Sequence, residues 1–326
     1  MALSLLDRSR TRVGHPDSEA LTGSIERAVN AEALGYQRFW VAEHHAVPGI
    51  ASGAPPVLLA AVGQRTENIR IGSGGVMLPN HQPFVVAEQF LMLEALQPGR
   101  IDLGLGRSRG FTTPVREALR EYEHGPADFA RDIAELRDYL DGRGPVTARP
   151  ESPGSIPMFV LATGAGMSTA ANLGLPVVIG GPILHGDGLN ELLTDYRRKY
   201  RPSERSPEPH VIISLDATLA ESVEEARELA LSEAWAMAVA RRTGEFPPLE
   251  SPTDIRSQTW RTQVRERVET SLDRAIAGDS DTVRPQLENL VDRTGANEIL
   301  ASTSTFDRAA LFRSDALLAE LVGTMS

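Results

Sequence analysis

Short apolar segments alternate with longer amphipathic segments along the whole chain. The apolar segments are rich in β-branched and aromatic residues, which is typical of strands buried on both faces of a parallel sheet. In the longer segments apolar residues recur about every 3.6 positions, as Leu21, Ile25 and Ala28 do, which predicts helices. We expect eight strands, at 2–6, 39–42, 69–72, 101–106, 158–161, 177–179, 210–215 and 298–301. The expected helices are 18–34, 56–65, 83–96, one or two within 114–142, one ending at 173, and 188–200, 221–242, 258–276, 281–293 and 306–321.

Eight strands that alternate with helices predict a (β/α)8 TIM barrel of the α/β class, with residues 1–326 as a single domain. The competing fold is an open, doubly wound sheet. Neither Gly72–Gly75 nor Gly104–Gly106 completes the G-x-G-x-x-G motif that usually marks that fold. A linker is expected at 143–157, and an irregular insertion at 243–257, after the seventh strand.

Composition narrows the possible functions. The formal net charge of −11 argues against generic nucleic-acid binding, because a basic surface is missing. The chain has no cysteine, which excludes disulfides, thiolate metal ligands and thiol nucleophiles. There is no apolar run long enough to span a membrane, and the N-terminus lacks the basic lead of a signal peptide. We therefore expect a cytoplasmic protein without a membrane partner.

The second predicted strand ends in three ionisable side chains, Glu43, His44 and His45. In a parallel barrel the carboxyl ends of all strands face one rim, where the sites of TIM barrels lie. Imidazoles at this rim can hold, donate or accept protons near neutral pH. A hydrogen-bonded strand end without chemistry is the alternative interpretation.

Further glycine and polar residues follow the next three strands. They are Ser73, Gly74, Gly75 and His81 after the third, Arg107 and Arg109 after the fourth, and Thr163, Gly164, Gly166 and Ser168 after the fifth. Glycines and hydroxyls at a helix start can bind an anion, and a nearby arginine can neutralise a phosphate. Consecutive glycines let a flat ligand approach the backbone. These features together predict a site for a phosphorylated planar cofactor, although each glycine pair alone is equally typical of a tight turn.

Two other kinds of site fit the sequence poorly. His44 and His45 are neighbours on a strand, so their side chains point to opposite faces, and the chain has no H-E-x-x-H motif. We therefore expect no metal centre. A serine hydrolase is also unsupported, since no G-x-S-x-G motif occurs.

Several segments resemble the luciferase-like flavin-dependent monooxygenases, the family that includes the bacterial luciferase subunits. The matching segments are Trp40–His45, Ile71–Pro79, Ala87–Glu94 and Pro98–Arg107, with a looser match at Ala296–Leu300. Within the family, the composition and the first-half motifs are most similar to the actinobacterial members that tailor polyketides in antibiotic biosynthesis.

The resemblance implies roles for the residues at the rim. It implies that reduced FMN lies across the strand ends, over a Gly74–Gly75 peptide that is often cis in the family. Arg107 matches a phosphate-binding arginine, and residues 163–168 match the rest of the phosphate site. His44 matches the catalytic histidine, assisted by His45 or Glu43. The insertion at 243–257 would serve as a lid.

The resemblance also implies an activity. The protein would be a two-component monooxygenase that receives FMNH2 from a separate flavin reductase, forms a C4a-(hydro)peroxyflavin with O2, and epoxidises or hydroxylates an organic, polyketide-like substrate. Two alternatives remain open: an F420-dependent oxidoreductase without oxygen chemistry, and a non-catalytic flavin-binding subunit. A homodimer is expected. The residue types do not specify the substrate, nor do they separate these oxygenations from Baeyer–Villiger chemistry.

Overall fold

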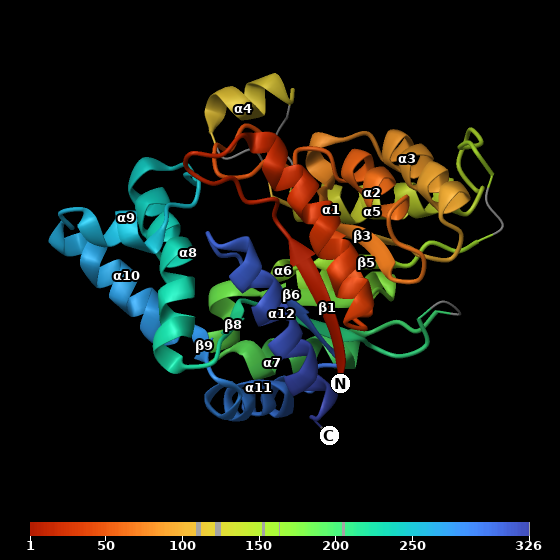
Figure 1. The fold of residues 1–326 in the computed structure, drawn as a ribbon. Coiled ribbons are helices and arrows are strands. Elements are labelled where there is room, and N and C mark those ends of the chain that lie inside the picture. Colours follow the sequence, from red (N-terminus) through yellow and green to blue (C-terminus); the bar gives the residue numbers. More distant parts are fainter. Residues whose placement is uncertain (109–111, 121–124, 152–153, 163, 204–205, 326) are drawn as a thin grey trace.

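A computed structural model describes residues 1–108, 112–120, 125–151, 154–162, 164–203 and 206–325. Its centre is a closed barrel of eight parallel strands, which confirms the predicted TIM barrel (Figure 1). In order round the barrel the strands are β1 (Ala2–Asp7), β10 (Glu298–Ala301), β7 (Val211–Leu215), β6 (Val177–Gly180), β5 (Met158–Leu161), β4 (Ile101–Gly106), β3 (Arg70–Met77) and β2 (Arg38–Val41). Closure is made by β1, which pairs with β10 on one side and with β2 on the other.

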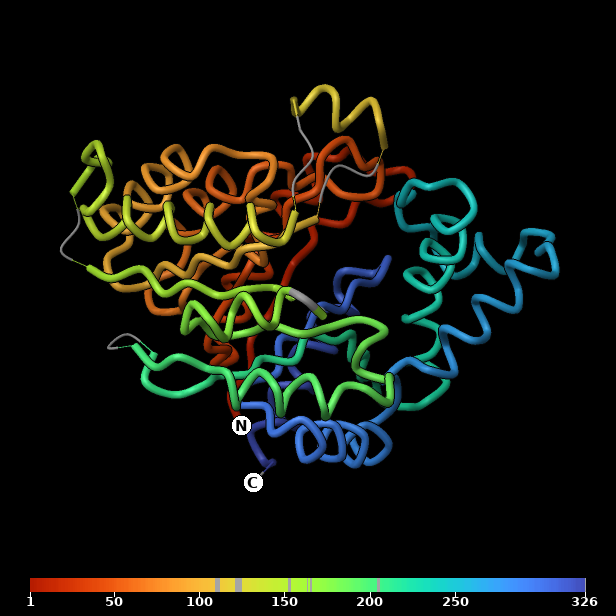
Figure 2. The backbone as a smooth tube through the Cα atoms, turned by 180° about the vertical axis from the view of Figure 1, so that it is seen from behind, coloured from red at the N-terminus to blue at the C-terminus, as the bar shows by residue number. Residues whose placement is uncertain are grey.

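Helices surround the barrel in the order expected from the sequence. They are α1 (Asp17–Ala33), α2 (Pro55–Gly63), α3 (Pro83–Leu96), α4 (Thr113–Ala118), α5 (Pro126–Leu140), α6 (Ala165–Leu173), α7 (Leu189–Lys199), α11 (Ser280–Thr294) and α12 (Arg308–Gly323), with short 3-10 helices η1 (Leu78–Asn80) and η2 (Gly181–His185). Both α6 and α11 end at a glycine in the left-handed conformation, Gly174 and Gly295, where a side chain would be strained. In both overall views the short α4 stands apart from the other helices (Figures 1 and 2).

Side chains fill the inside of the barrel from the amino ends of the strands to the middle. An apolar layer lies across the middle; its members are Leu6, Trp40, Ala42, Phe159, Val178, Ile212 and Leu300. At the amino ends of the strands, the buried Arg38 pairs with Asp102 at 2.8 Å and with Glu298 at 3.0 Å. Because these opposite charges are paired, the layer leaves none of the three charges buried without a partner. The open space of the barrel is therefore at the carboxyl ends of the strands.

The insertion after the seventh barrel strand is larger than the sequence indicated. It consists of β8 (Ala217–Leu219), α8 (Val223–Thr243), α9 (Pro252–Ser257), α10 (Thr262–Arg274) and β9 (Ile276–Gly278). The small parallel sheet of β8 and β9 was not predicted, because strands of three residues show no periodicity. The three helices pack through a separate apolar cluster that includes Trp235, Ile255 and Val268. In both overall views α9 and α10 lie to one side of the barrel (Figures 1 and 2).

Residues 243–257, the predicted irregular insertion and lid, contain α9 and are fastened to the barrel. The Gly49 N–H donates a hydrogen bond to the carbonyl of Phe246 at 2.8 Å, and the Leu249 N–H donates to the carbonyl of Thr11 at 2.9 Å. Thr11 and Gly49 belong to the loops after β1 and β2. This segment is thereby fixed beside the strand ends where the site was predicted.

The third strand differs from the prediction. Residues 69–72 were expected to lead into a glycine loop, but β3 continues to Met77, with a register shift against β4 between Ser73 and Val76. Glycine permits this pairing, because a Cβ on Gly75 would lie 2.7 Å from the carbonyl oxygen of Gly104. The Gly74–Gly75 peptide is cis, as the resemblance implied. Among the described residues, no helix combines the length and apolarity needed to cross a membrane.

Candidate active site at the barrel mouth

The carboxylate of Glu43 organises the polar residues after β2 and β3. Its Oε1 atom lies 2.7 Å from Nε2 of His45 and 2.7 Å from Nε2 of His81. Its Oε2 atom accepts a hydrogen bond from the Met77 N–H at 3.0 Å. We call Glu43, His45 and His81 the Glu43 cluster. The sequence predicted Glu43 and His45 as alternative assistants of His44; it placed His81 at the same rim but gave it no role.

The Glu43 side chain is fully buried, yet its pKa is held at about 2. Burial alone would raise the pKa, but the hydrogen bonds from His45, His81 and the Met77 N–H outweigh it. Glu43 is therefore an anion at neutral pH. Because its lone pairs are occupied by these donors, it acts as an anchor that fixes the two imidazoles.

The Glu43 cluster also has the composition of a metal site. One ligand atom from each of its three residues lies within 4.8 Å of the others. A metal ion would have to displace both imidazole nitrogens from the hydrogen bonds they make to Glu43, since a ligating nitrogen cannot also donate. The arrangement described here is that of a hydrogen-bonded network.

His44 differs from its two neighbours. It is half-buried, and its backbone N–H donates to the carbonyl of Ser52 at 2.9 Å. Burial, followed by the nearby charge of Arg8, lowers its pKa to about 4, because the opposing charge of Glu43 is too weak to compensate. His44 is consequently a neutral imidazole at pH 7, able to accept a proton. This is the state expected of a base rather than of a strong acid.

The two consecutive glycines that were predicted to let a flat ligand approach the backbone lie inside β3. Gly74 and Gly75 are both buried, and a Cβ on Gly74 would lie 2.5 Å from Cδ1 of Leu6. The hydroxyl of Ser73 donates to the carbonyl of Gly104 at 2.8 Å, so it joins β3 to β4. Ser73, predicted to contact the cofactor, therefore has a structural partner.

The predicted phosphate residues leave adjacent strands. Leu105 of β4 pairs with Val160 of β5, so Arg107 and the turn at Gly164 follow neighbouring strand ends. Arg107 is exposed, and Gly164 has a φ of 57° immediately before α6. Gly166 and Ser168 lie in the first turns of α6. Thr163 and Arg109 lie outside the described residues. Arg107 and the start of α6 thus flank one part of the rim.

A cavity of about 870 Å³ opens over the barrel mouth. Its floor is made by residues at the carboxyl ends of β1, β5, β6, β7 and β10, and its far wall by α8 and α10. The floor residues include Arg8, Leu161, Gly180, Ser214 and Ser302. Ser108, which follows Arg107, also lines it. The volume is in the range that holds a cofactor together with a small organic molecule.

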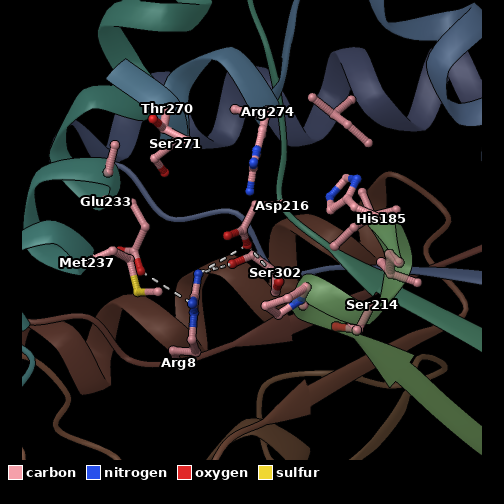
Figure 3. Close-up of a pocket in the computed structure, with 18 of the residues that line it drawn as sticks. Arg8, His185, Ser214, Asp216, Glu233, Met237, Thr270, Ser271, Arg274 and Ser302 are labelled. Carbon is pink, nitrogen blue, oxygen red and sulfur yellow. Dashed lines mark hydrogen bonds and ion pairs between the residues drawn. The ribbon is translucent and has the colours of Figure 1, made fainter. Parts of the chain in front are cut away.

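Arg8 is the central cation of the cavity floor (Figure 3). Its Nη2 donates to the carbonyl of Ser302 at 2.7 Å and lies 3.2 Å from Asp216, and its Nη1 lies 3.3 Å from Glu233 of α8. Glu233 also pairs with Arg10 at 3.0 Å. These ion pairs tie the insertion to β1. Arg8 lies between the predicted strand at 2–6 and the predicted helix at 18–34 and received no predicted role, although its position directly after a strand was the available signal.

The site can be tested for its fit to a flavin phosphate. At one part of the rim, the exposed guanidinium of Arg107 provides a positive charge and the glycine turn into α6 provides a helix N-terminus, and both attract a phosphate. The cavity leaves room for a flat ring over the ends of β5, β6 and β7, while Gly74 and Gly75 of β3 are not among its lining residues. The buried Nε atom of Arg8 has no hydrogen-bond partner among the described residues, which leaves a donor for a ligand. The residues therefore fit such a cofactor.

Comparison with known proteins identifies relatives over the whole chain. The family model for luciferase-like monooxygenases matches residues 1–298. A luciferase-like monooxygenase of Escherichia coli (strain K12) is 38% identical over 321 residues, covering 96% of this chain and 95% of its own length. An N-acetyl-S-alkylcysteine monooxygenase of Bacillus subtilis (strain 168) is 38% identical over 208 residues, or 61% of each protein. The crystal structure of apo-MsnO8 has a TM-score of 0.89 at 33% identity and covers 99% of both chains.

More distant structures share the fold alone. The oxygenating constituent of 3,6-diketocamphane monooxygenase from Pseudomonas putida, in complex with FMN, has a TM-score of 0.77 at 18% identity, covering 100% of this chain and 99% of its own. An F420-dependent secondary alcohol dehydrogenase has a TM-score of 0.72 at 15% identity, covering 99% and 98%. The same barrel thus occurs with either cofactor.

Proposed function

The chain belongs to the luciferase-like monooxygenase family, and from that premise we propose that it is a flavin-dependent monooxygenase that uses reduced FMN and O2 to oxygenate an organic substrate at the barrel mouth. The observation that carries the proposal is the cavity of about 870 Å³ over the strand ends, which is lined by Ser108, directly after the family-matching Arg107. When bound, the reduced flavin supplies the activation of O2.

The residues of this chain would hold and shield that cofactor. Arg107 and the helix start at Gly164–Ser168 would bind the phosphate, since they combine a positive charge with the N-terminal end of α6. The Gly74–Gly75 segment of β3 would lie against the ring. The helices of the insertion would keep water from the reacting atoms, which is needed because reduced flavin and O2 otherwise yield hydrogen peroxide.

His44 would act in its neutral form. With a pKa of about 4, only about one molecule in 10³ carries a protonated His44 at pH 7. An imidazole nitrogen of His44 would therefore accept a proton or a hydrogen bond during oxygen transfer. His45 would support this role indirectly, because Glu43 fixes its ring. Such general base catalysis contributes about 10²–10⁴-fold.

The remaining expectations are proposals of the same kind. A separate flavin reductase would supply FMNH2, since the sequence has no nicotinamide-binding motif. The name of the Bacillus subtilis relative suggests thioethers as substrates, and the resemblance to polyketide-tailoring members suggests polyketides. The homodimer, the single domain and the cytoplasmic location stay predictions.

The proposal is tested by supplying the purified protein with a flavin reductase, NADH, FMN and labelled ¹⁸O2. N-acetyl-S-methylcysteine and a panel of aromatic polyketides serve as candidate substrates. We expect one of them to gain a single labelled oxygen atom, and the apo-protein to bind FMN more tightly than F420. Tighter binding of F420, with substrate-dependent hydride transfer and no label, would establish the F420-dependent alternative. Peroxide as the sole product across the panel would favour the non-catalytic subunit.

A further inference from the structure

The two walls of the mouth cavity differ in character. Leu161, Val178 and Leu184, on the barrel side, give it an apolar surface. The α10 side carries Arg267, Thr270, Ser271 and Arg274, which all line the cavity. These four residues are spaced i, i+3, i+4 and i+7, so they form one stripe along the helix. We call them the α10 stripe. Figure 3 shows Thr270, Ser271 and Arg274 together above the cavity, with Arg274 reaching into it.

The acidic groups around Arg8, which are Asp216 after β7 and Glu233 of α8, are already neutralised. Asp216 pairs with Arg8, and Glu233 pairs with both Arg8 and Arg10. Burial raises the pKa of Glu233, but the two arginines outweigh it and keep the pKa below its ordinary value. The floor therefore presents a balanced set of charges, and these acids are not available as full counterions for the opposite wall.

The α10 wall is not balanced in the same way. Arg241 of α8 joins the arginines of the α10 stripe, and Glu266 is the acidic lining residue on this side. In the part of the chain that the structure describes, no carboxylate oxygen lies within 4.0 Å of these three guanidinium groups. Within the same residues, the hydroxyls of Thr270 and Ser271 make no hydrogen bond. In a protein of net charge −11, a concave wall with surplus cations concentrates anions locally.

We propose that the mouth cavity selects an organic anion, whose apolar body lies on the barrel wall and whose carboxylate, sulfonate or phosphate group is held by the α10 stripe. That the bound anion is oxygenated rests on the proposed function, but binding of the anion can be tested without measuring oxygenation. Arg267 and Arg274 would bind the anion, and Thr270 and Ser271 would donate hydrogen bonds to it. Charge-assisted contacts of this kind are among the strongest that a side chain offers a ligand.

The phosphate of the cofactor is the other anion that could meet this wall. Arg107 and the start of α6, which follow β4 and β5, provide a separate set of groups for that phosphate. The α10 stripe belongs to the insertion between β7 and β10. An anionic substrate and the cofactor phosphate lead to different predictions, because a stripe that binds the substrate can be changed without loss of FMN affinity.

The test compares ligands of one length and different charge by isothermal titration calorimetry, with the apo-protein and with the FMN-loaded protein. Octanoate, octanol and octylamine are the probes. We expect octanoate to bind at least tenfold more tightly than octanol in both forms. The double variant R267Q/R274Q is expected to lose this preference, while its affinities for octanol and FMN stay within twofold of those of the unaltered protein.

Two further variants separate charge from fold. R261Q removes one positive charge from the start of the same helix, outside the cavity lining, and should behave like the unaltered protein. R274K keeps the charge and should retain most of the preference for octanoate. Thermal unfolding of each variant verifies that it folds.

Three results would overturn the proposal: octanoate binding no tighter than octanol, an equal loss in R261Q, or a fall in FMN affinity in the double variant. The last would assign the stripe to the cofactor. Since no turnover is measured, a protein that prefers octanoate but oxygenates nothing would contradict the proposed function and leave the anion site standing.

Discussion

Replacing Glu43 by glutamine tests how the rim is held together. The carboxylate binds two imidazoles and one backbone N–H, and its pKa falls from an ordinary value of 4.5 to about 2. At about 1.4 kcal/mol per pKa unit, this difference corresponds to about 3 kcal/mol of stability at neutral pH. A glutamine amide keeps the size of the side chain but loses the charge, and it cannot accept hydrogen bonds in the same number.

The stability should depend on pH with a definite sign. Because the folded-state pKa of Glu43 is depressed, its contribution is fully present above about pH 4.5 and is lost as the pH falls toward 2. The difference between the unaltered protein and E43Q should therefore be about 3 kcal/mol at pH 7 and less than half of that at pH 3. For a chain of 326 residues, 3 kcal/mol lowers Tm by about 4 °C.

Urea unfolding at pH 7 and at pH 3, followed by circular dichroism, measures the stability difference between E43Q and the unaltered protein at each pH. Glu94→Gln is the matched control, because Glu94 is also buried but its carboxylate accepts one backbone hydrogen bond, from the N–H of Gly99 at 2.8 Å. E94Q should cost about 1 kcal/mol. If E43Q were as stable as the unaltered protein, or if its deficit did not shrink in acid, the anchoring role of Glu43 would be wrong.

Other predictions follow from the same site. H44N should lower the oxygenation rate about 10²–10⁴-fold with FMN affinity unchanged. In the unaltered enzyme, the profile of rate against pH should show no titration of His44 between about pH 6 and 9. A rate that falls as the pH rises through 7 would contradict a neutral imidazole. R8Q should raise the pKa of His44, which an NMR titration of the imidazole measures, whereas R8K should leave this pKa nearly unchanged. If the pKa of His44 were the same in R8Q and R8K, burial rather than the charge of Arg8 would set it. G75A should lower the free energy of unfolding in urea by about 1–3 kcal/mol, since its Cβ would lie 2.7 Å from a backbone carbonyl of β4. G53A, whose Cβ would make ordinary contacts, should be tolerated. An equal loss of stability in both variants would point to the flexibility of glycine rather than to this contact. Dialysis against a chelator should change neither Tm nor FMN binding, and a lowered Tm restored by a divalent ion would assign a metal to the Glu43 cluster.

The sequence by itself determined the barrel. Its eight short apolar segments had to be buried on both faces, and the segments between them had a helical period, so a closed parallel barrel was the economical arrangement. The bounds of β4, β5, β10 and α3 agree with the prediction residue for residue. The order of the strands also fixed which ends meet, and so placed Glu43, His44 and Arg107 at one rim.

Only the tertiary structure decided what each rim residue does. Two histidines of similar sequence context, His44 and His45, have different surroundings, because one is fixed by Glu43 while the other lies within the field of Arg8. Contacts such as that of Arg8 with Glu233, which lies far along the chain, depend on how the insertion packs. A local pattern cannot encode these distances, since hydrogen bonds and pKa shifts are set by neighbours in space rather than in sequence. The α10 stripe is visible in the sequence as a spacing, but only the fold turns it toward a cavity.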